Sequence, residues 1–144
     1  MAEVVNRYAA IDLFIPEEYH KSVGDFVSRA QNDTRPFSRQ IDLWWLAVGI
    51  GVQAGYRTPS PGKDKGTKFN TAAILNSDPW RITQLELLAL AEEGDAVLSD
   101  PNRVIQIASE YANTGFQWLM EQMLGEAEPT LALMNGLAEQ LPSD

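Results

Sequence analysis

The chain has 144 residues, the size of one domain, and contains no cysteine, which excludes disulfide frameworks, zinc–thiolate sites and thiol nucleophiles. Its net charge of −9 is uneven, because residues 1–81 hold ten Lys and Arg against nine Asp and Glu, whereas residues 82–144 hold one against eleven. Because residues 82–144 are so acidic, they would repel phosphates. This charge disfavours a protein that wraps around nucleic acid.

The first thirty residues show no targeting signal. Glu3 and Arg7 interrupt the N-terminus, which lacks the continuous apolar stretch of a signal peptide, and we expect a cytoplasmic protein. A short extended segment is expected within residues 9–15. Pro16 suits the first turn of a helix that reaches about Ala30. Helical spacing predicts its buried side, which consists of Tyr19, Val23, Phe26 and Val27.

An apolar helix is expected over residues 38–54. It is hydrophobic on every side, which is typical of the buried centre of a domain. Its uncharged stretch, residues 43–56, is shorter than the roughly 20 residues that a membrane span needs. Gly49 and Gly51 would allow a neighbouring helix to approach closely, and Gly55 suits a C-terminal cap.

Residues 56–69 form the longest stretch without helical periodicity, and their Pro, Gly and Lys content predicts an exposed basic loop. We expect a site there that contacts an anion, either nucleic-acid phosphate or an acidic partner surface. The alternative is a solvated loop with no ligand. The residues of this predicted site are Arg57, Lys63, Lys65, Lys68 and Arg81.

Three further helices are predicted in the second half. Ser77 or Asp78 before Pro79 opens the first, which Gly94 ends. Asp100 and Pro101 open the second, which reaches about Leu124 and has a core stripe of Val104, Ala108, Tyr111, Gly115 and Trp118 or Leu119. Glu128 and Pro129 open the last, within an acidic C-terminal helix and tail, residues 126–144. Its expected buried side is Leu131, Met134, Leu137 and Leu141.

Helical periodicity over most of the chain, with no convincing strand of period two, predicts an all-α fold. We expect a single domain, residues 1–144, built as a compact orthogonal bundle of about five helices around the helix 38–54. Adjacent Trp44 and Trp45 cannot both point the same way on that helix. One of them could therefore reach a surface used for association.

The residues that could carry chemistry are few. His20 is the one histidine, which excludes a two-histidine metal motif. The acidic residues near Gly94 do not follow the calcium-loop spacing and are expected at helix ends for capping. We therefore expect no catalytic residue, metal site or cofactor. An acidic face that meets a basic partner is the functional alternative to mere solubility, with Glu92, Glu93, Asp95, Glu121, Glu126 and Glu128 as its residues.

Three segments together resemble a known family. They are GYRTP at residues 55–59, LLALAEEGDAVL at residues 87–98 and ASEYANTGFQWL at residues 108–119. In this order they resemble Dnd system-associated protein 4, a family of small proteins encoded beside DNA phosphorothioation genes. The resemblance implies an accessory protein of bacterial defence against phage, and it transfers no catalytic residue. Within these segments we expect Arg57 to contact a carboxylate such as Glu110.

The function predicted from the sequence is a non-catalytic adaptor in a DNA-modification-linked defence system, acting through protein–protein contacts with other components. Two alternatives remain: an accessory protein that contacts DNA through the basic residues 57–68, and an acidic decoy that mimics DNA. No membrane partner is expected, and homo-oligomerisation is left open by the sequence.

Overall fold

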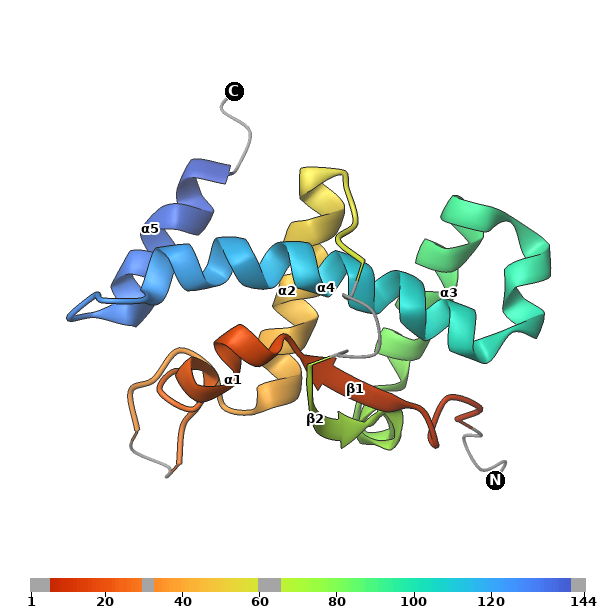
Figure 1. Cartoon of the computed structure of the whole chain (residues 1–144), viewed down its shortest axis with the longest axis horizontal. Helices are drawn as coiled ribbons and strands as arrows, with labels where there is room; N and C mark the ends of the chain where they lie inside the picture. Colours follow the sequence, from red (N-terminus) through yellow and green to blue (C-terminus); the bar gives the residue numbers. More distant parts are fainter. Residues whose placement is uncertain (1–5, 30–32, 60–65, 141–144) are drawn as a thin grey trace.

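The computed structural model describes residues 6–29, 33–59 and 66–140 and shows a mostly helical fold with one small antiparallel sheet (Figure 1). The helices contact one another closely, as the predicted bundle requires. In chain order the elements are β1 (Asp12–Ile15), α1 (Glu17–Val23), α2 (Gln40–Ala54), β2 (Thr67–Thr71), the 3-10 helix η1 (Ala72–Ser77), α3 (Pro79–Glu93), the 3-10 helix η2 (Asp95–Ser99), α4 (Pro101–Met123) and α5 (Pro129–Gln140).

The most extensive contact joins α2 and α4, which cross in the centre of the molecule (Figure 1). Gly51 lies against the backbone of Tyr111, and Gly115 lies against the backbone of Ala47. A β-carbon at either glycine would collide with the facing helix, so the close approach predicted at Gly51 is confirmed and Gly115 provides a second one. Gly49 is different, because it is exposed and has open space beside it. The expectation that Gly49 admits a neighbouring helix is therefore wrong.

The ends of the central helices follow local signals in the sequence. Gly55 caps α2 in the left-handed conformation, with φ of +83°, and Gly94 follows α3 with φ of +81°. The Asp100 side chain accepts a hydrogen bond from the Arg103 backbone N–H at 3.2 Å, which caps the N-terminus of α4. These signals place the predicted boundaries of the three helices within about two residues.

The predicted N-terminal helix is too long, because α1 ends at Val23. Phe26 and Val27 reach the core from an irregular segment. Phe37 accepts a hydrogen bond from the Ser28 N–H at 2.7 Å and donates one to the Phe26 carbonyl at 3.1 Å. Contact with a distant part of the chain thus replaces the helical hydrogen bonds that the local spacing predicted.

No convincing strand was predicted, yet β2 occupies Thr67–Thr71 and includes the last three residues of the expected loop 56–69. It pairs antiparallel with β1, whose extended conformation was expected within residues 9–15. Five residues are too few to show alternation, and the pairing is fixed by β1, more than fifty residues earlier. The expected exposed loop is therefore shorter than predicted.

Helix α5 turns inward a face that only partly matches the predicted one, because Leu137 packs against the core as expected but Leu131 and Met134 do not. Leu131 is 51% exposed and Met134 is 61% exposed, whereas Leu133 and Gly136 are buried. Gly136 lies directly against the side chain of Gln122 on α4, which would have to move if a β-carbon were added there. Leu141 lies outside the described residues. Both faces of α5 have helical spacing of apolar residues, so periodicity alone did not decide between them.

Candidate partner-binding surface

The predicted basic cluster is not assembled by the described part of the chain. Arg57 lies 3.7 Å from Glu110, and Lys68 lies 3.0 Å from Asp12, each in an ion pair within the chain. Arg81 is only 8% exposed, so its assignment to an exposed basic site is wrong. Lys63 and Lys65, the remaining two members, lie outside the described residues.

Arg81 instead holds α2 against α3. Its guanidinium lies 5.2 Å from the ring centres of both Trp45 and Trp80, and it donates a hydrogen bond to Asp42 at 3.0 Å. Burial opposes ionisation of Asp42, but hydrogen bonds from Arg39 and Arg81 outweigh it and lower the pKa of that carboxyl. Trp44 is buried and Trp80 is 54% exposed, so Trp80 rather than Trp44 or Trp45 presents the largest aromatic surface on this side.

The three segments that carry the family resemblance meet in space. Arg57 contacts Glu110 as expected, and the Thr58 backbone N–H donates to the Glu110 carbonyl at 3.0 Å. Tyr111 donates a hydrogen bond to Glu92, and this bond, with burial, raises the pKa of the Tyr111 hydroxyl. These contacts join the end of α2, the end of α3 and the middle of α4, so the segments have a structural role.

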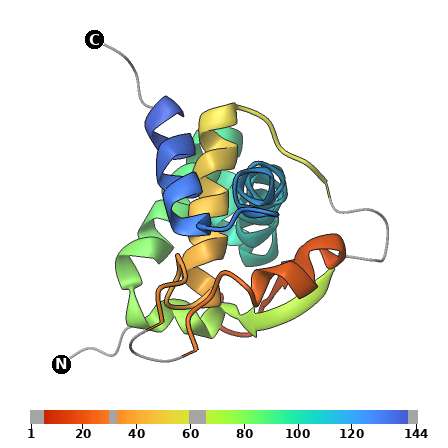
Figure 2. The ribbon, with the colours of Figure 1, turned by 90° about the vertical axis from the view of Figure 1, so that its left-hand side faces the viewer.

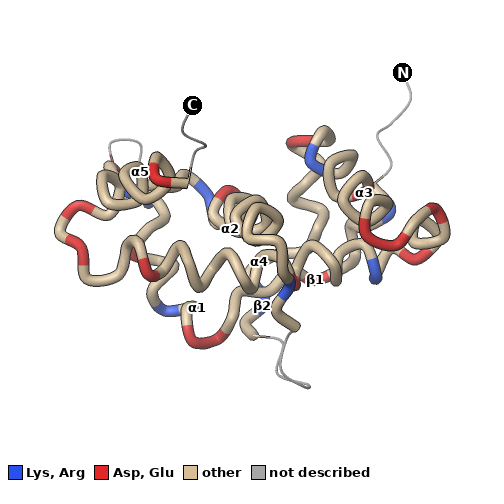
Figure 3. The backbone as a smooth tube through the Cα atoms, turned by 90° about the horizontal axis from the view of Figure 1, so that it is seen from above, with Lys and Arg blue, Asp and Glu red and all other residues tan. Residues whose placement is uncertain are grey.

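The predicted acidic face divides into two groups. At the α3 end of α4, Arg103 binds Glu93 through two nitrogens, with its shortest contact at 2.7 Å, and this pairing lowers the pKa of Glu93. Glu92 is bonded to Tyr111, and Asp95 is exposed on η2. Glu121, Glu126 and Glu128 lie at the other end of α4, which is about 33 Å long. Figure 3 shows acidic residues gathered at both ends.

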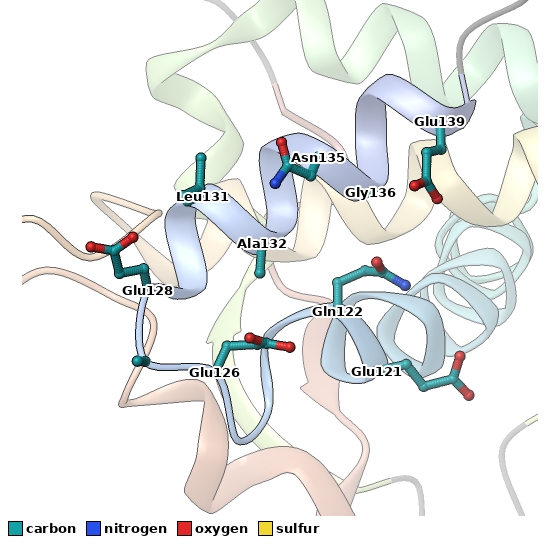
Figure 4. A pocket seen from close by; sticks show the side chains of 10 residues that line it. Glu121, Gln122, Glu126, Glu128, Leu131, Ala132, Asn135, Gly136 and Glu139 are labelled. Atoms are coloured by element: carbon teal, nitrogen blue, oxygen red, sulfur yellow. The ribbon is translucent and has the colours of Figure 1, made fainter.

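The second group surrounds a hollow between α4 and α5, which we call the acidic groove. Figure 4 shows its carboxylate side chains extending from α4, from the connecting segment and from α5. The hollow has a volume of about 560 Å³. The side chains that define the acidic groove are Glu121, Gln122, Glu126, Glu128, Leu131, Ala132, Asn135 and Glu139.

The four glutamates of the acidic groove, at positions 121, 126, 128 and 139, make no ion pair within the ranges that the structure describes. The charge of Glu121 contributes, after burial and the charge of Glu18, to raising the pKa of Tyr19 on α1. Glu139, which the sequence reasoning missed, joins the groove because α5 folds back along α2, where Gln53 donates to the Gln140 carbonyl at 3.0 Å (Figure 2). A count of acidic residues on α5 would have found it.

Local sequence explains how the groove forms. Helix α4 ends at Met123, and Gly125, with φ of +77°, reverses the chain before Pro129 opens α5. The short connection leaves Glu126 and Glu128 at the junction of the two helices. Leu131 also lines the groove and stays 51% exposed. The result is a concave acidic surface with an exposed leucine among its lining residues.

Two other hollows border α4. One, of about 170 Å³, lies between the C-terminal end of α2 and α4, and it shares Glu121 with the acidic groove. The other, of about 800 Å³, lies between β1 and the N-terminal half of α4, and its lining mixes apolar side chains with polar ones that include Asn102, Gln106, Ser109 and Asn113.

Within residues 6–29, 33–59 and 66–140, no group of three or more His, Asp and Glu side chains is arranged to hold a metal ion. Nor do the described helices include one that is long and apolar enough to cross a membrane. His20 is exposed on α1.

Comparison with known proteins gives no match to a family model, to a curated protein or to a solved structure. The resemblance to Dnd system-associated protein 4 therefore stays a prediction from three short segments.

Proposed function

We propose that this chain is a non-catalytic adaptor that binds a basic segment of another protein in the acidic groove. The observation that carries the proposal is the set of four glutamates around one hollow without an ion-pair partner in the described chain. Leu131, which lines the same hollow and is 51% exposed, supplies apolar contact area beside these charges.

Like charges around the groove raise the electrostatic energy of the unbound chain. Carboxylates that surround one hollow repel one another, and this repulsion is relieved when a basic segment enters. Complementary charge also speeds association and rejects acidic partners. The end of α4 adds to the negative potential, because no basic residue occupies its last turn to offset the helix dipole. Binding of this kind should weaken as the ionic strength rises.

We further propose that the partner belongs to a bacterial defence system linked to DNA phosphorothioation and that binding takes place in the cytoplasm. Support for this setting comes from the resemblance of residues 55–59, 87–98 and 108–119. No specific observation favours either alternative, a protein that contacts DNA or an acidic decoy that mimics DNA. The described basic residues of the predicted DNA contact are paired within the chain, and the acidic residues of the predicted decoy form two separate groups.

Co-expression of a tagged chain with the proteins encoded beside its gene tests the proposal. We expect at least one neighbour-encoded protein to co-purify in a salt-sensitive manner. Replacing Glu126→Lys and Glu128→Lys together should abolish this co-purification, because the groove then repels a basic segment. A matched control, Glu17→Lys with Asp95→Lys, makes the same change in net charge at exposed positions away from the groove and should retain the partner.

Thermal unfolding of both double variants, followed by circular dichroism, establishes that each is folded before binding is compared. The proposal fails if none of the neighbour-encoded proteins is retained by the unaltered chain. It also fails if the groove variant and the control variant retain the partner equally, since the partner would then not be held by the groove.

A further inference from the structure

We infer that the hollow beside Tyr56 and Trp118 receives one arginine side chain of the partner, an inference that rests on the proposed function. We call this hollow the arginine slot. Its lining includes Tyr56, Trp118, Glu121 and Gln117, together with the last turns of α2. At about 170 Å³ it is below the usual volume of a small-molecule site and suits a single long side chain.

The slot combines two kinds of group that attract a guanidinium, aromatic rings and a carboxylate. Tyr56 is 56% exposed, so its ring is available for contact with a cation, and Trp118 offers a second aromatic surface. Glu121 provides a carboxylate that can accept two parallel hydrogen bonds from an arginine. These are the aromatic and anionic contacts that arginine makes when it is recognised by proteins.

The fold supplies a further negative contribution and a fixed wall. Helix α2 ends at the slot, and its last turn contains no basic residue, so the negative end of its dipole is not offset there. The Thr114 hydroxyl donates to the Tyr56 carbonyl at 3.1 Å and also bonds to the Thr58 hydroxyl at 2.7 Å. These bonds hold the backbone of Tyr56 against α4 before any partner arrives.

Continuity with the acidic groove connects the slot to the proposed function. Glu121 lines both hollows. On α5, Glu139 lines the acidic groove and the adjacent Gln140 lines the arginine slot. A basic segment lying in the groove therefore has the slot within reach of one of its side chains. Arginine is favoured over lysine there, because the planar guanidinium stacks on aromatic rings and pairs with a carboxylate in a fixed geometry, whereas the ammonium is a more strongly hydrated point charge.

Fluorescence anisotropy with two labelled peptides tests the slot. One probe is a short peptide in which arginines alternate with alanines, and the other has every arginine replaced by lysine. The unaltered chain should bind the arginine peptide about threefold more tightly than the lysine peptide. Tyr56→Ala should abolish that preference, and Tyr56→Phe should keep it, since the ring and not the hydroxyl makes the contact.

Glu139→Gln is the matched control, because Glu139 lines the acidic groove but not the slot. It should weaken binding of both peptides by the same factor and leave the arginine preference unchanged. The slot is overturned if the unaltered chain shows no preference or if Tyr56→Ala retains it, and salt-sensitive binding of both peptides would then leave the proposed function standing. If neither peptide binds, the proposed function itself is contradicted.

Discussion

Glutamate side chains have different surroundings at the two ends of α4. Near α3, Glu93 is held by Arg103 and Glu92 accepts a hydrogen bond from Tyr111. Near α5, Glu121 and Glu126 make no ion pair within the described ranges of the chain. Arg103 is the one basic residue among residues 82–144, and the fold places it at the α3 end.

This difference separates charges that hold the fold together from charges that remain available to a partner. Carboxylates at the α3 end contribute to contacts between α3 and α4. Carboxylates at the α5 end lie around a hollow and repel one another, so the folded chain gains nothing from their proximity. Composition alone, which is acidic throughout this half, does not reveal the distinction.

The largest effect should follow from disturbing the α2–α4 crossing, which fixes the middle of α4 and keeps its two ends apart. Gly115→Ala would drive a β-carbon into the backbone of Ala47. Because neither helix can move without disrupting the core, we expect a loss of about 3 kcal/mol or more in the free energy of unfolding. Urea denaturation followed by circular dichroism measures it.

Gly49→Ala is the matched control on α2, since Gly49 is exposed and has open space around it. Alanine favours the helical conformation, so this variant should be more stable by about 0.5 to 1 kcal/mol. Similar stabilities for the two variants would show that the crossing does not depend on glycine.

A smaller loss of stability is expected when Asp42 is replaced. Asp42 on α2 accepts hydrogen bonds from Arg39 and from Arg81 on α3. Its pKa is lowered in the folded state, so its contribution to stability is complete above the unfolded pKa of about 4 and is lost as the pH falls through the lower folded value. Asp42→Asn should therefore reduce the free energy of unfolding by about 2 kcal/mol at pH 7. The difference from the unaltered chain should shrink below about pH 4. If the difference in the free energy of unfolding between the two chains stays constant down to pH 2, the stabilising role of the ionised Asp42 carboxylate is contradicted.

The sequence predicted those parts of the fold that depend on local signals. The glycines at positions 55 and 94 and the Asp-Pro pair at 100–101 ended or began helices as expected. It did not predict β2, because the pairing of a five-residue strand depends on β1. It also failed at the end of α1, where Phe26 and Val27 contribute to the core from a segment paired with Phe37.

The candidate site was predictable in composition but not in geometry. Glu121, Glu126 and Glu128 were expected on an acidic face, and the groove contains all three. The same expectation included Glu92 and Glu93, which α4 separates from the groove by most of its length. Whether a carboxylate is paired depends on which distant side chain the fold brings to it. Local spacing carries no information about that.

The comparison between the ends of α4 gives a last and smallest prediction. Neutralising Glu126 and Glu128 together, as Glu126→Gln with Glu128→Gln, should raise the melting temperature slightly at low salt, because repulsion around the groove falls. Glu93→Gln should lower the melting temperature, because Arg103 loses its charged partner. Both shifts should diminish as salt is added, since these side chains lie at the surface and are screened. Differential scanning fluorimetry across a salt series measures the two signs. If the groove variant is also destabilised, its glutamates have partners that stabilise the fold, and they would not be available to a basic segment.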